Sequence, residues 1–172
     1  MDEAATVERS FDGWYRAEHP RLICLLTVAA GDADLACDLT DEAFTRALER
    51  WERVREMASP AAWTCQVGLN LLRRRARRAA LEARLLRRAA EPPRPPAAVE
   101  PDLWAAVAAL PARQRTAIAL RYICDLPQAE VAEVMGVAPG TVAATLNAAR
   151  RRLATALGDA QTDVARLEVR LD

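Results

Sequence analysis

Residues 128–147 read QAEVAEVMGVAPGTVAATLN and set the architecture of the C-terminal half of the chain. Apolar residues recur at helical spacing on both sides of Gly136. Ala132 is small enough for two helices to cross closely, Gly136 suits the turn, and Val142 is placed to pack the second helix on the first. The stretch therefore predicts a helix-turn-helix, although a plain helical hairpin meets the same demands.

The segments around this stretch have the spacing of further helices. Pro101 opens one that extends to residue 110, a second runs from Pro111 to residue 124, and the last runs from Gly140 to about residue 157. We predict a four-helix domain over residues 102–158, followed by a weakly amphipathic tail at 159–172.

Upstream of this domain, residues 91–101 read EPPRPPAAVEP, with five prolines among eleven residues. Proline removes backbone donors and forbids a continuous helix, so the segment is predicted to be an extended linker that reaches about 3 Å per residue. It separates the C-terminal domain from an N-terminal domain at 1–90.

The N-terminal domain is predicted to hold three or four helices. Apolar residues recur at helical spacing over 8–31, 32–55 and 60–75, with a continuation toward residue 90. Ser59 followed by Pro60 fits a helix N-cap with proline at the first helical position. Few residues are Gly or aromatic, which favours helix over sheet. The expected fold is all-α: two small helical domains joined by a Pro-rich linker, the C-terminal one a helix-turn-helix four-helix domain.

The net charge is zero, but the charge is unevenly distributed. Residues 1–58 hold 13 acidic residues and 7 arginines, residues 59–90 hold 8 arginines and one acid, and residues 102–158 hold 6 arginines and 4 acids. Two basic segments after an acidic one indicate two contacts with polyanions and a separate contact with a protein.

The most basic segment, residues 71–78, reads LLRRRARR and follows Trp63 on one predicted helix. Neutralisation of phosphates is the obvious function, but five arginines in six positions cover more than one helix face, so some are only solvated. Trp63 offers a stacking surface for an unpaired base; the alternative is an ordinary core tryptophan. The arginine run at 150–152 suits phosphate contact, or it merely complements the helix dipole.

Residues 34–51 form a predicted amphipathic helix with an acidic outer face. Such a face is often only solvated, but clustered carboxylates in a protein with basic segments also suit a protein partner. The outer face carries Asp38, Asp41 and Glu42, and the inner side carries Leu39, Ala43, Ala47 and Trp51, or Phe44 and Leu48.

Cysteine and histidine usage gives no sign of a metal site. Cys24, Cys37, Cys65 and Cys124 are scattered without a C-x-x-C pair, and His19 is the only histidine. We interpret the cysteines as buried small apolar residues rather than zinc ligands or a disulfide framework. Without a Gly-rich phosphate loop or paired carboxylates, we expect no catalytic residue, no cofactor and no enzyme. An acidic start and no long apolar run predict a cytoplasmic protein without a signal peptide or membrane insertion.

Taken together, these segments resemble the extracytoplasmic-function group of the sigma-70 family of RNA polymerase sigma factors. Residues 11–51, with Tyr15, PRL at 20–22 and DLTDEAF at 38–44, resemble the start of region two, whose acidic helix binds the polymerase. SPAAW at 59–63 through NLLRR at 70–74 resembles the part that opens and reads the minus-ten element.

The second half resembles region four, which reads the minus-thirty-five element. The resemblance rests on LPARQR at 110–115, LRY at 120–122 and AEVAEVMGVAPGTV at 129–142. It implies a non-enzymatic subunit in which residues 1–90 are region two and residues 102–158 are region four. The implied partners are core RNA polymerase and promoter DNA, with an anti-sigma protein as a further candidate.

The resemblance also implies three groups of site residues. The polymerase-binding group is Asp38, Asp41, Glu42, Arg46 and Trp51. The minus-ten group is Ser59, Trp63, Asn70, Arg73, Arg74 and Arg77. The minus-thirty-five group is Gln128, Thr141, Thr145, Asn147, Arg150 and Arg151.

One departure affects the last group. Where the family usually carries basic and polar residues, residues 143–148 read AATLNA, so Thr141, Thr145 and Asn147 are the only polar side chains before Arg150. Either the minus-thirty-five contact is weak, or it uses few hydrogen bonds plus DNA shape. The cap position, Ala138, also lacks a side-chain acceptor.

Two other classes of function fit parts of the pattern. A plain helix-turn-helix regulator would bind DNA without polymerase, but the arginine stretch beside Trp63 and the acidic helix count against it. An interaction protein that keeps this architecture but binds promoters weakly is favoured only by the alanine-rich last helix.

Overall fold

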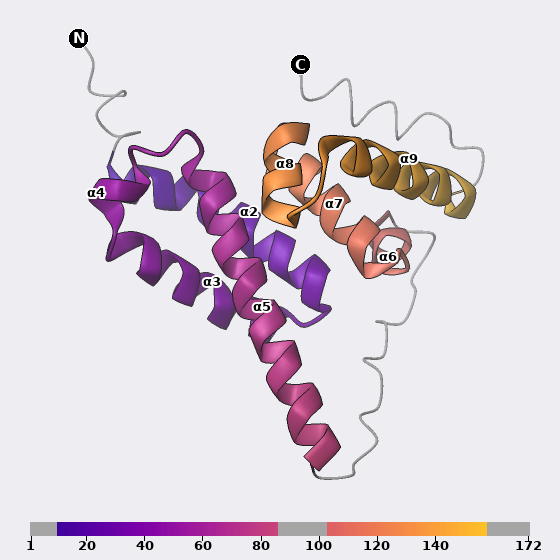
Figure 1. Cartoon of the computed structure of the whole chain (residues 1–172), viewed down its shortest axis with the longest axis horizontal. Helices are drawn as coiled ribbons and strands as arrows, with labels where there is room; N and C mark the ends of the chain where they lie inside the picture. Colours follow the sequence, from indigo (N-terminus) through magenta and orange to yellow (C-terminus); the bar gives the residue numbers. More distant parts are fainter. Residues whose placement is uncertain (1–9, 86–102, 158–172) are drawn as a thin grey trace. The chain divides into compact units, whose positions relative to one another are not determined.

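The computed structural model of the chain describes residues 10–85 and 103–157. Every regular element in these two ranges is an α-helix, so the all-α prediction is confirmed. The helices form two compact units (Figure 1). Unit 1 contains α2 (Phe11–Ala30), α3 (Ala33–Leu48), α4 (Trp51–Val54) and α5 (Pro60–Leu85). Unit 2 contains α6 (Leu103–Ala108), α7 (Ala112–Tyr122), α8 (Gln128–Met135) and α9 (Pro139–Ala156).

Local signals place the helix ends of unit 1. The predicted N-cap of α5 is confirmed, because Ser59 Oγ accepts a hydrogen bond of 3.2 Å from the Ala62 N–H and Pro60 is the first helical residue. Helix α2 ends at Gly31, whose φ of 72° is a left-handed conformation that glycine adopts without steric cost. The Gly31 N–H donates to the Thr27 carbonyl at 2.8 Å, which satisfies one of the last carbonyls of α2.

The helix predicted over residues 32–55 is interrupted. Helix α3 ends at Leu48, and the short α4 begins only at Trp51. The break turns Trp51 toward α2, where its ring lies 5.3 Å from Phe11 and 4.9 Å from Trp14. Leu48 was expected on the inner side and is instead 56% exposed. Each residue turns a helix by about 100°, so Leu48 lies off the face that Ala47 buries.

The core of unit 1 lies where α2, α3 and α5 meet. Gly68 of α5 makes this meeting close: a Cβ atom there would lie 3.2 Å from Cδ1 of both Leu22 and Leu26. These apolar side chains leave water, and burial of a leucine contributes roughly 1.5–3 kcal/mol. The buried apolar residues of unit 1 are Leu22, Leu25, Leu26, Ala36, Leu39, Ala43, Phe44, Ala47, Val54, Ala62, Cys65, Leu69 and Leu71.

Unit 2 has the four helices that the sequence predicts. Leu120 of α7, Val131 of α8 and Val142 of α9 are each fully buried at their common core. The turn after α7 passes through Asp125, a non-glycine residue with a φ of 52°, and the turn after α8 passes through Gly136, with a φ of 66°.

The cysteine interpretation is correct for Cys65 and Cys124, which are buried, but wrong for Cys37, which is exposed on α3. Cys24 is half-buried. Cys37 lies beside Asp38 on the solvent-exposed side of α3. Its place on the helix, rather than its apolar character, therefore determines its exposure. Within the two described ranges, no helix combines the length and apolar character needed to cross a bilayer. The predicted linker at 91–101 and the tail at 159–172 lie outside the described residues.

Candidate functional site

Helices α8 and α9 form the predicted helix-turn-helix. At the turn, the Val137 N–H donates to the Ala132 carbonyl at 3.0 Å, and the left-handed Gly136 closes α8. Ala132 and Val142 are both buried, as the sequence predicts. Ala138 caps α9 without a side-chain hydrogen bond, which agrees with the prediction of a weakly capped helix start.

Two of the predicted minus-thirty-five residues use their donors inside the unit. The Gln128 side-chain amide donates to the Pro139 carbonyl at 3.1 Å, which ties the start of α8 to the start of α9. The Thr145 hydroxyl donates to the Thr141 carbonyl at 2.7 Å. Thr141 and Asn147 are exposed at the surface of α9.

Arg150 lies apart from its neighbour Arg151. Arg150 is half-buried, and both its Nε, at 2.8 Å, and its Nη2 donate to the hydroxyl of Tyr122 on α7. Its guanidinium also lies 5.7 Å from the centre of the Tyr122 ring. Arg151 is exposed. The two arginines are neighbours in one basic run of the sequence, but only Arg150 joins α9 to α7.

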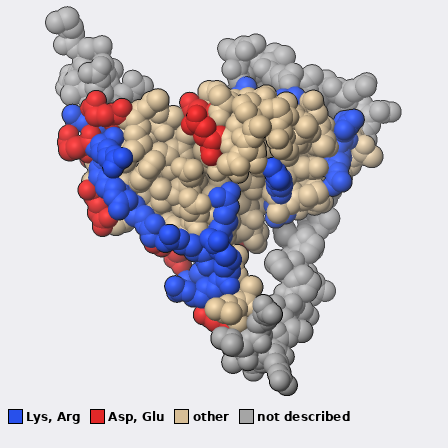
Figure 2. All heavy atoms as spheres, viewed as in Figure 1, with Lys and Arg blue, Asp and Glu red and all other residues tan. Residues whose placement is uncertain are grey.

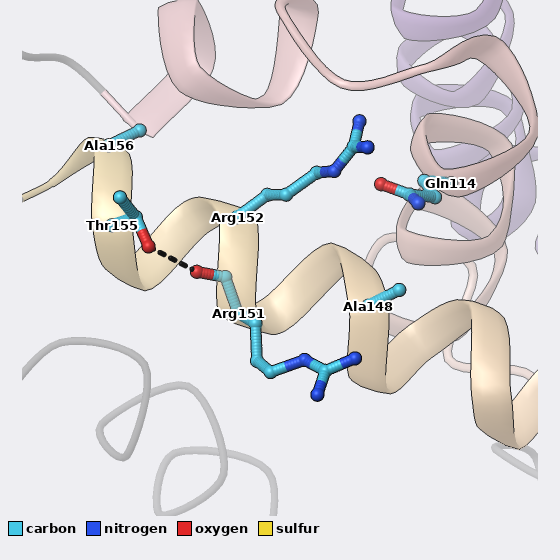
Figure 3. A pocket seen from close by; sticks show the side chains of 6 residues that line it. All are labelled: Gln114, Ala148, Arg151, Arg152, Thr155 and Ala156. Atoms are coloured by element: carbon cyan, nitrogen blue, oxygen red, sulfur yellow. Dashed lines mark hydrogen bonds between the residues drawn. The ribbon is translucent and has the colours of Figure 1, made fainter.

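A groove of about 470 Å³ lies between α7 and the second half of α9 (Figure 3). The Arg152 side chain extends across it toward Gln114 (Figure 3), whose buried Oε1 accepts no hydrogen bond from the described residues. Sequence reasoning did not find this groove, because Gln114 and Arg152 lie 38 positions apart. The remaining lining residues are Ala148, Arg151, Thr155 and Ala156.

Helix α5 carries the basic surface of unit 1. Arg73, Arg74, Arg75, Arg77 and Arg78 are all exposed. Figure 2 shows arginines gathered over the second half of this helix. Residues 73–82 are exposed on every side, so this part of α5 extends beyond the core of unit 1. Because the five arginines point from several faces of the helix, they suit contact with phosphates on more than one stretch of the DNA backbone rather than insertion into a single groove.

The other predicted minus-ten residues lie along the same helix. Arg73 Nη1 donates to Oδ1 of Asn70 at 3.0 Å, so these two side chains orient each other. Trp63 is half-buried, and part of its ring therefore remains accessible. Ser59 is half-buried as well and serves as the N-cap of α5.

The acidic face of α3 is exposed as predicted. The side chain of Asp41 is 74% exposed and lies 3.6 Å from the imidazole of His19, and Glu42 forms an ion pair with Arg46 one turn later. Asp38 is exposed on the same side of the helix. Surface pairs of this kind contribute little to stability, so the carboxylates remain available to a partner.

Aromatic rings support α3 from the other side. Trp51 is half-buried, and Phe11, Trp14, Tyr15, His19 and Phe44 complete a cluster whose neighbouring ring centres lie 4.8 to 5.9 Å apart. Next to this cluster, burial raises the pKa of Glu18, an effect that Arg21 partly opposes at 3.2 Å.

Comparison with known proteins agrees with this geometry. A model of sigma-70 region 2 matches residues 14–82, within unit 1, and a model of sigma-70 region 4 matches residues 101–153, within unit 2. Together the two matches cover more than half of the chain. No curated protein matches it.

The solved structures that are similar to the chain include the following two. One is the sigma factor RpoE of Bartonella quintana in complex with the anti-sigma factor NepR, at 22% identity and a TM-score of 0.72 over 86% of this chain and 96% of that chain. The other is an RsbN-BldN complex, at 25% identity and a TM-score of 0.35 over 85% of this chain and 90% of that chain. The first likeness supports the fold. With regions 2 and 4 matched to its two helical units, the chain belongs to the sigma-70 family of RNA polymerase sigma factors.

Proposed function

We propose that the chain directs promoter-specific transcription initiation through three separate surfaces. The acidic face of α3 binds core polymerase, α5 binds the minus-ten element, and α8 with α9 binds the minus-thirty-five element. The observation that supports this division most strongly is the segregation of charge within unit 1. Carboxylates are exposed on α3, and arginines are exposed on α5.

For core polymerase, the contact residues are Asp38, Asp41, Glu42 and Arg46. The three carboxylates are exposed on one side of α3, which suits a complementary basic surface, and the half-buried Arg46 pairs with Glu42. Trp51 does not contact the polymerase itself in this proposal. Its ring packs against Phe11 and Trp14 and so holds the end of α3 in place.

For the minus-ten element, Arg73, Arg74 and Arg77 neutralise phosphates, and Asn70 orients the first of them. Trp63 stacks on an unpaired base with the accessible part of its ring. Ser59 contributes by fixing the start of α5.

For the minus-thirty-five element, Thr141 and Asn147 are the exposed polar groups at the start of α9, and Arg151 is an exposed cation farther along. Gln128, Thr145 and Arg150 act through the contacts that they make within unit 2.

The remaining features of the proposal concern the setting of the protein. It acts in the cytoplasm and makes or breaks no bond itself. An anti-sigma protein is a further partner by analogy with RpoE, whose solved structure contains the anti-sigma factor NepR.

Run-off transcription on genomic fragments, with core polymerase in the presence and absence of the chain, tests the proposal. We expect discrete new start sites that define the promoter. Replacement of Asp38, Asp41 and Glu42 by Ala should lower core affinity at least tenfold, because three rim charges are lost. The matched control replaces Asp12, Glu52 and Glu56, three exposed acids outside α3, by Ala and should leave core affinity unchanged. Equal core affinity for both variants would contradict the assignment of α3.

The alanine-rich start of α9, which carries no charged side chain before Arg150, favours one alternative, a sigma-like interaction protein that binds promoters weakly. Core binding without new start sites would support that alternative. Duplex binding without core association would instead indicate a simple regulator.

A further inference from the structure

The groove between α7 and the second half of α9 has an unsatisfied acceptor on one wall and unpaired cations on the other. Oε1 of Gln114, on α7, is buried and accepts no hydrogen bond from the described residues. Arg151 and Arg152, on α9, are exposed, and neither guanidinium pairs with an acidic side chain of the described ranges. Since buried polar groups are nearly always hydrogen-bonded, we expect Oε1 of Gln114 to gain a donor when the groove is in use.

Arg152 is placed to supply that donor. Figure 3 shows its side chain extended across the groove toward Gln114, whereas the side chain of Arg151 points away from Gln114. A guanidinium carries five N–H donors in a planar fork, so one hydrogen bond to Oε1 leaves the other donors available. Gln114 would therefore fix the direction of the Arg152 guanidinium without using up its capacity to bind a second group.

The charge of the groove selects the class of that second group. Two of the six lining residues are arginines, and none of the six is acidic. A guanidinium fork matches two oxygens of a phosphate or a carboxylate, and each such bond is strengthened by the opposite charges. The small side chains of Ala148 and Ala156 leave room beside the arginines. The groove is therefore suited to an anion with at least two oxygens.

The course of α9 favours a DNA phosphate as this anion. Thr141, Ala144, Ala148, Arg151 and Thr155 follow one another at steps of three or four residues, so one side of the helix leads from its exposed start into the groove. The ten residues from Thr141 to Arg151 rise about 15 Å, and the major groove of DNA is about 12 Å wide. A helix whose start reaches base edges thus places its second half near the phosphates that border the major groove.

We propose that the groove between α7 and α9 binds one phosphate of the DNA backbone beside the minus-thirty-five element. Arg152 contacts the phosphate, Arg151 adds a second positive charge, and Gln114 is a positioning residue that holds the Arg152 guanidinium. This inference rests on the proposed function of unit 2. It adds α7 to a DNA-binding surface that was assigned to α8 and α9 alone.

Methylphosphonate substitution tests the inference, because it replaces one charged phosphate of the backbone by a neutral group. The probe is a promoter fragment identified by run-off transcription, with one substitution at a time around the upstream element, bound by the full-length chain in complex with core polymerase. On unmodified DNA, Arg152→Ala should bind about fivefold more weakly and reduce the slope of log affinity against log salt by about 1. At one backbone position, substitution should weaken the original chain but not Arg152→Ala, which already lacks the contact.

Two further variants assign the effect within the groove. Gln114→Met keeps the length of the side chain and removes the acceptor, so it should weaken binding about twofold in the original chain and have no further effect in Arg152→Ala. A purely structural role of Gln114 would give the same loss in both backgrounds. The matched control is Arg113→Ala, which removes an exposed arginine of α7 outside the groove. It should keep the sensitivity to the methylphosphonate that Arg152→Ala loses.

Distinct outcomes would overturn the inference. Equal sensitivity of the original chain and Arg152→Ala at every backbone position would exclude phosphate binding in the groove but leave the proposed function intact. Lower affinity of Arg152→Ala for core polymerase, with unchanged DNA affinity, would show that the groove binds an acidic segment of a protein instead. Additive effects of Gln114→Met and Arg152→Ala would contradict the positioning role of Gln114. A complex that binds no unmodified promoter fragment would overturn the proposed function itself, and the inference with it.

Discussion

Helices α5 and α9 are both proposed to contact DNA, yet they present opposite chemistry. The second half of α5 exposes five arginines within six positions. The first half of α9 carries no charged side chain and exposes Thr141, Ala144 and Asn147. Charge contacts give affinity that depends on salt and tolerates many sequences, whereas base-edge contacts give selectivity. We therefore expect α5 to contribute most of the DNA affinity and α9 to contribute discrimination between sites.

The largest expected effect comes from the removal of charge on α5. Replacement of Arg73, Arg74 and Arg77 by Ala should weaken promoter binding about 100-fold at about 0.1 M salt and reduce the slope of log affinity against log salt by about 2 to 3, because three phosphate contacts are lost. Fluorescence anisotropy of the polymerase complex across a salt series measures both quantities.

The control for that variant removes the same charge elsewhere in unit 1. Replacement of Arg50, Arg53 and Arg55, all exposed outside α5, by Ala should leave the salt slope unchanged. If both triple variants reduce the slope equally, the effect comes from net charge, and the contrast between α5 and α9 is lost.

A smaller effect is expected from Gly140→Ala on α9. The backbone there tolerates alanine, so unit 2 should gain roughly 0.5–1 kcal/mol in its free energy of unfolding. Promoter affinity should nevertheless fall several-fold, because the added methyl group would hold the start of α9 away from the major groove of the DNA. Thermal unfolding and anisotropy should therefore move in opposite directions. A variant that is more stable and binds equally well would show that no close approach occurs.

Unlike the exposed arginines of α5, Arg150 of α9 is held by Tyr122, and Tyr122→Phe tests this difference. The change removes the hydroxyl that accepts from Arg150, which should cost unit 2 about 1 kcal/mol and lower its melting temperature by about 4–8 °C. An unchanged melting temperature would mean that this contact does not stabilise unit 2.

The smallest expected effect is a pH dependence of the folding stability of unit 1. Burial raises the pKa of Glu18 above its ordinary value of 4.5, so the folded state of unit 1 binds this proton more readily than the unfolded state. The resulting stabilisation is fully present below pH 4.5 and is lost as the pH rises through the folded pKa. The melting temperature of the original chain should fall as the pH rises from 4.5 through the folded pKa of Glu18, and the melting temperature of Glu18→Gln should change less over the same pH range. Identical profiles would contradict the role of Glu18.

Local sequence signals predicted most of the fold because they act within a few residues. The N-cap at Ser59, the stop at Gly31 and the turn at Gly136 each depend on the conformational preference of one or two residues. The break before Trp51 was missed, because no glycine or proline marks it. It arises from the packing of an indole against Phe11 and Trp14, which lie far away in the sequence.

The candidate site was predicted as a set of residue types, and the structure separates those residues by their contacts. Asp41, Arg74 and Thr141 are exposed, as the contacts proposed for them require. Trp51 and Arg150 instead make their main contacts with other elements of their own units. The groove beside Gln114 could not be predicted from the sequence, because its two walls come from different helices.

The sequence by itself determined the helices, their caps and turns, the segregation of charge and the family of the protein. These properties depend on the period of apolar residues and on short motifs, both of which can be read along the chain. Only the tertiary structure decided which polar groups remain available to DNA. Arg150 and Tyr122 are 28 positions apart, and a hydrogen bond between them forms only when packing brings their atoms to about 3 Å, which no local pattern encodes.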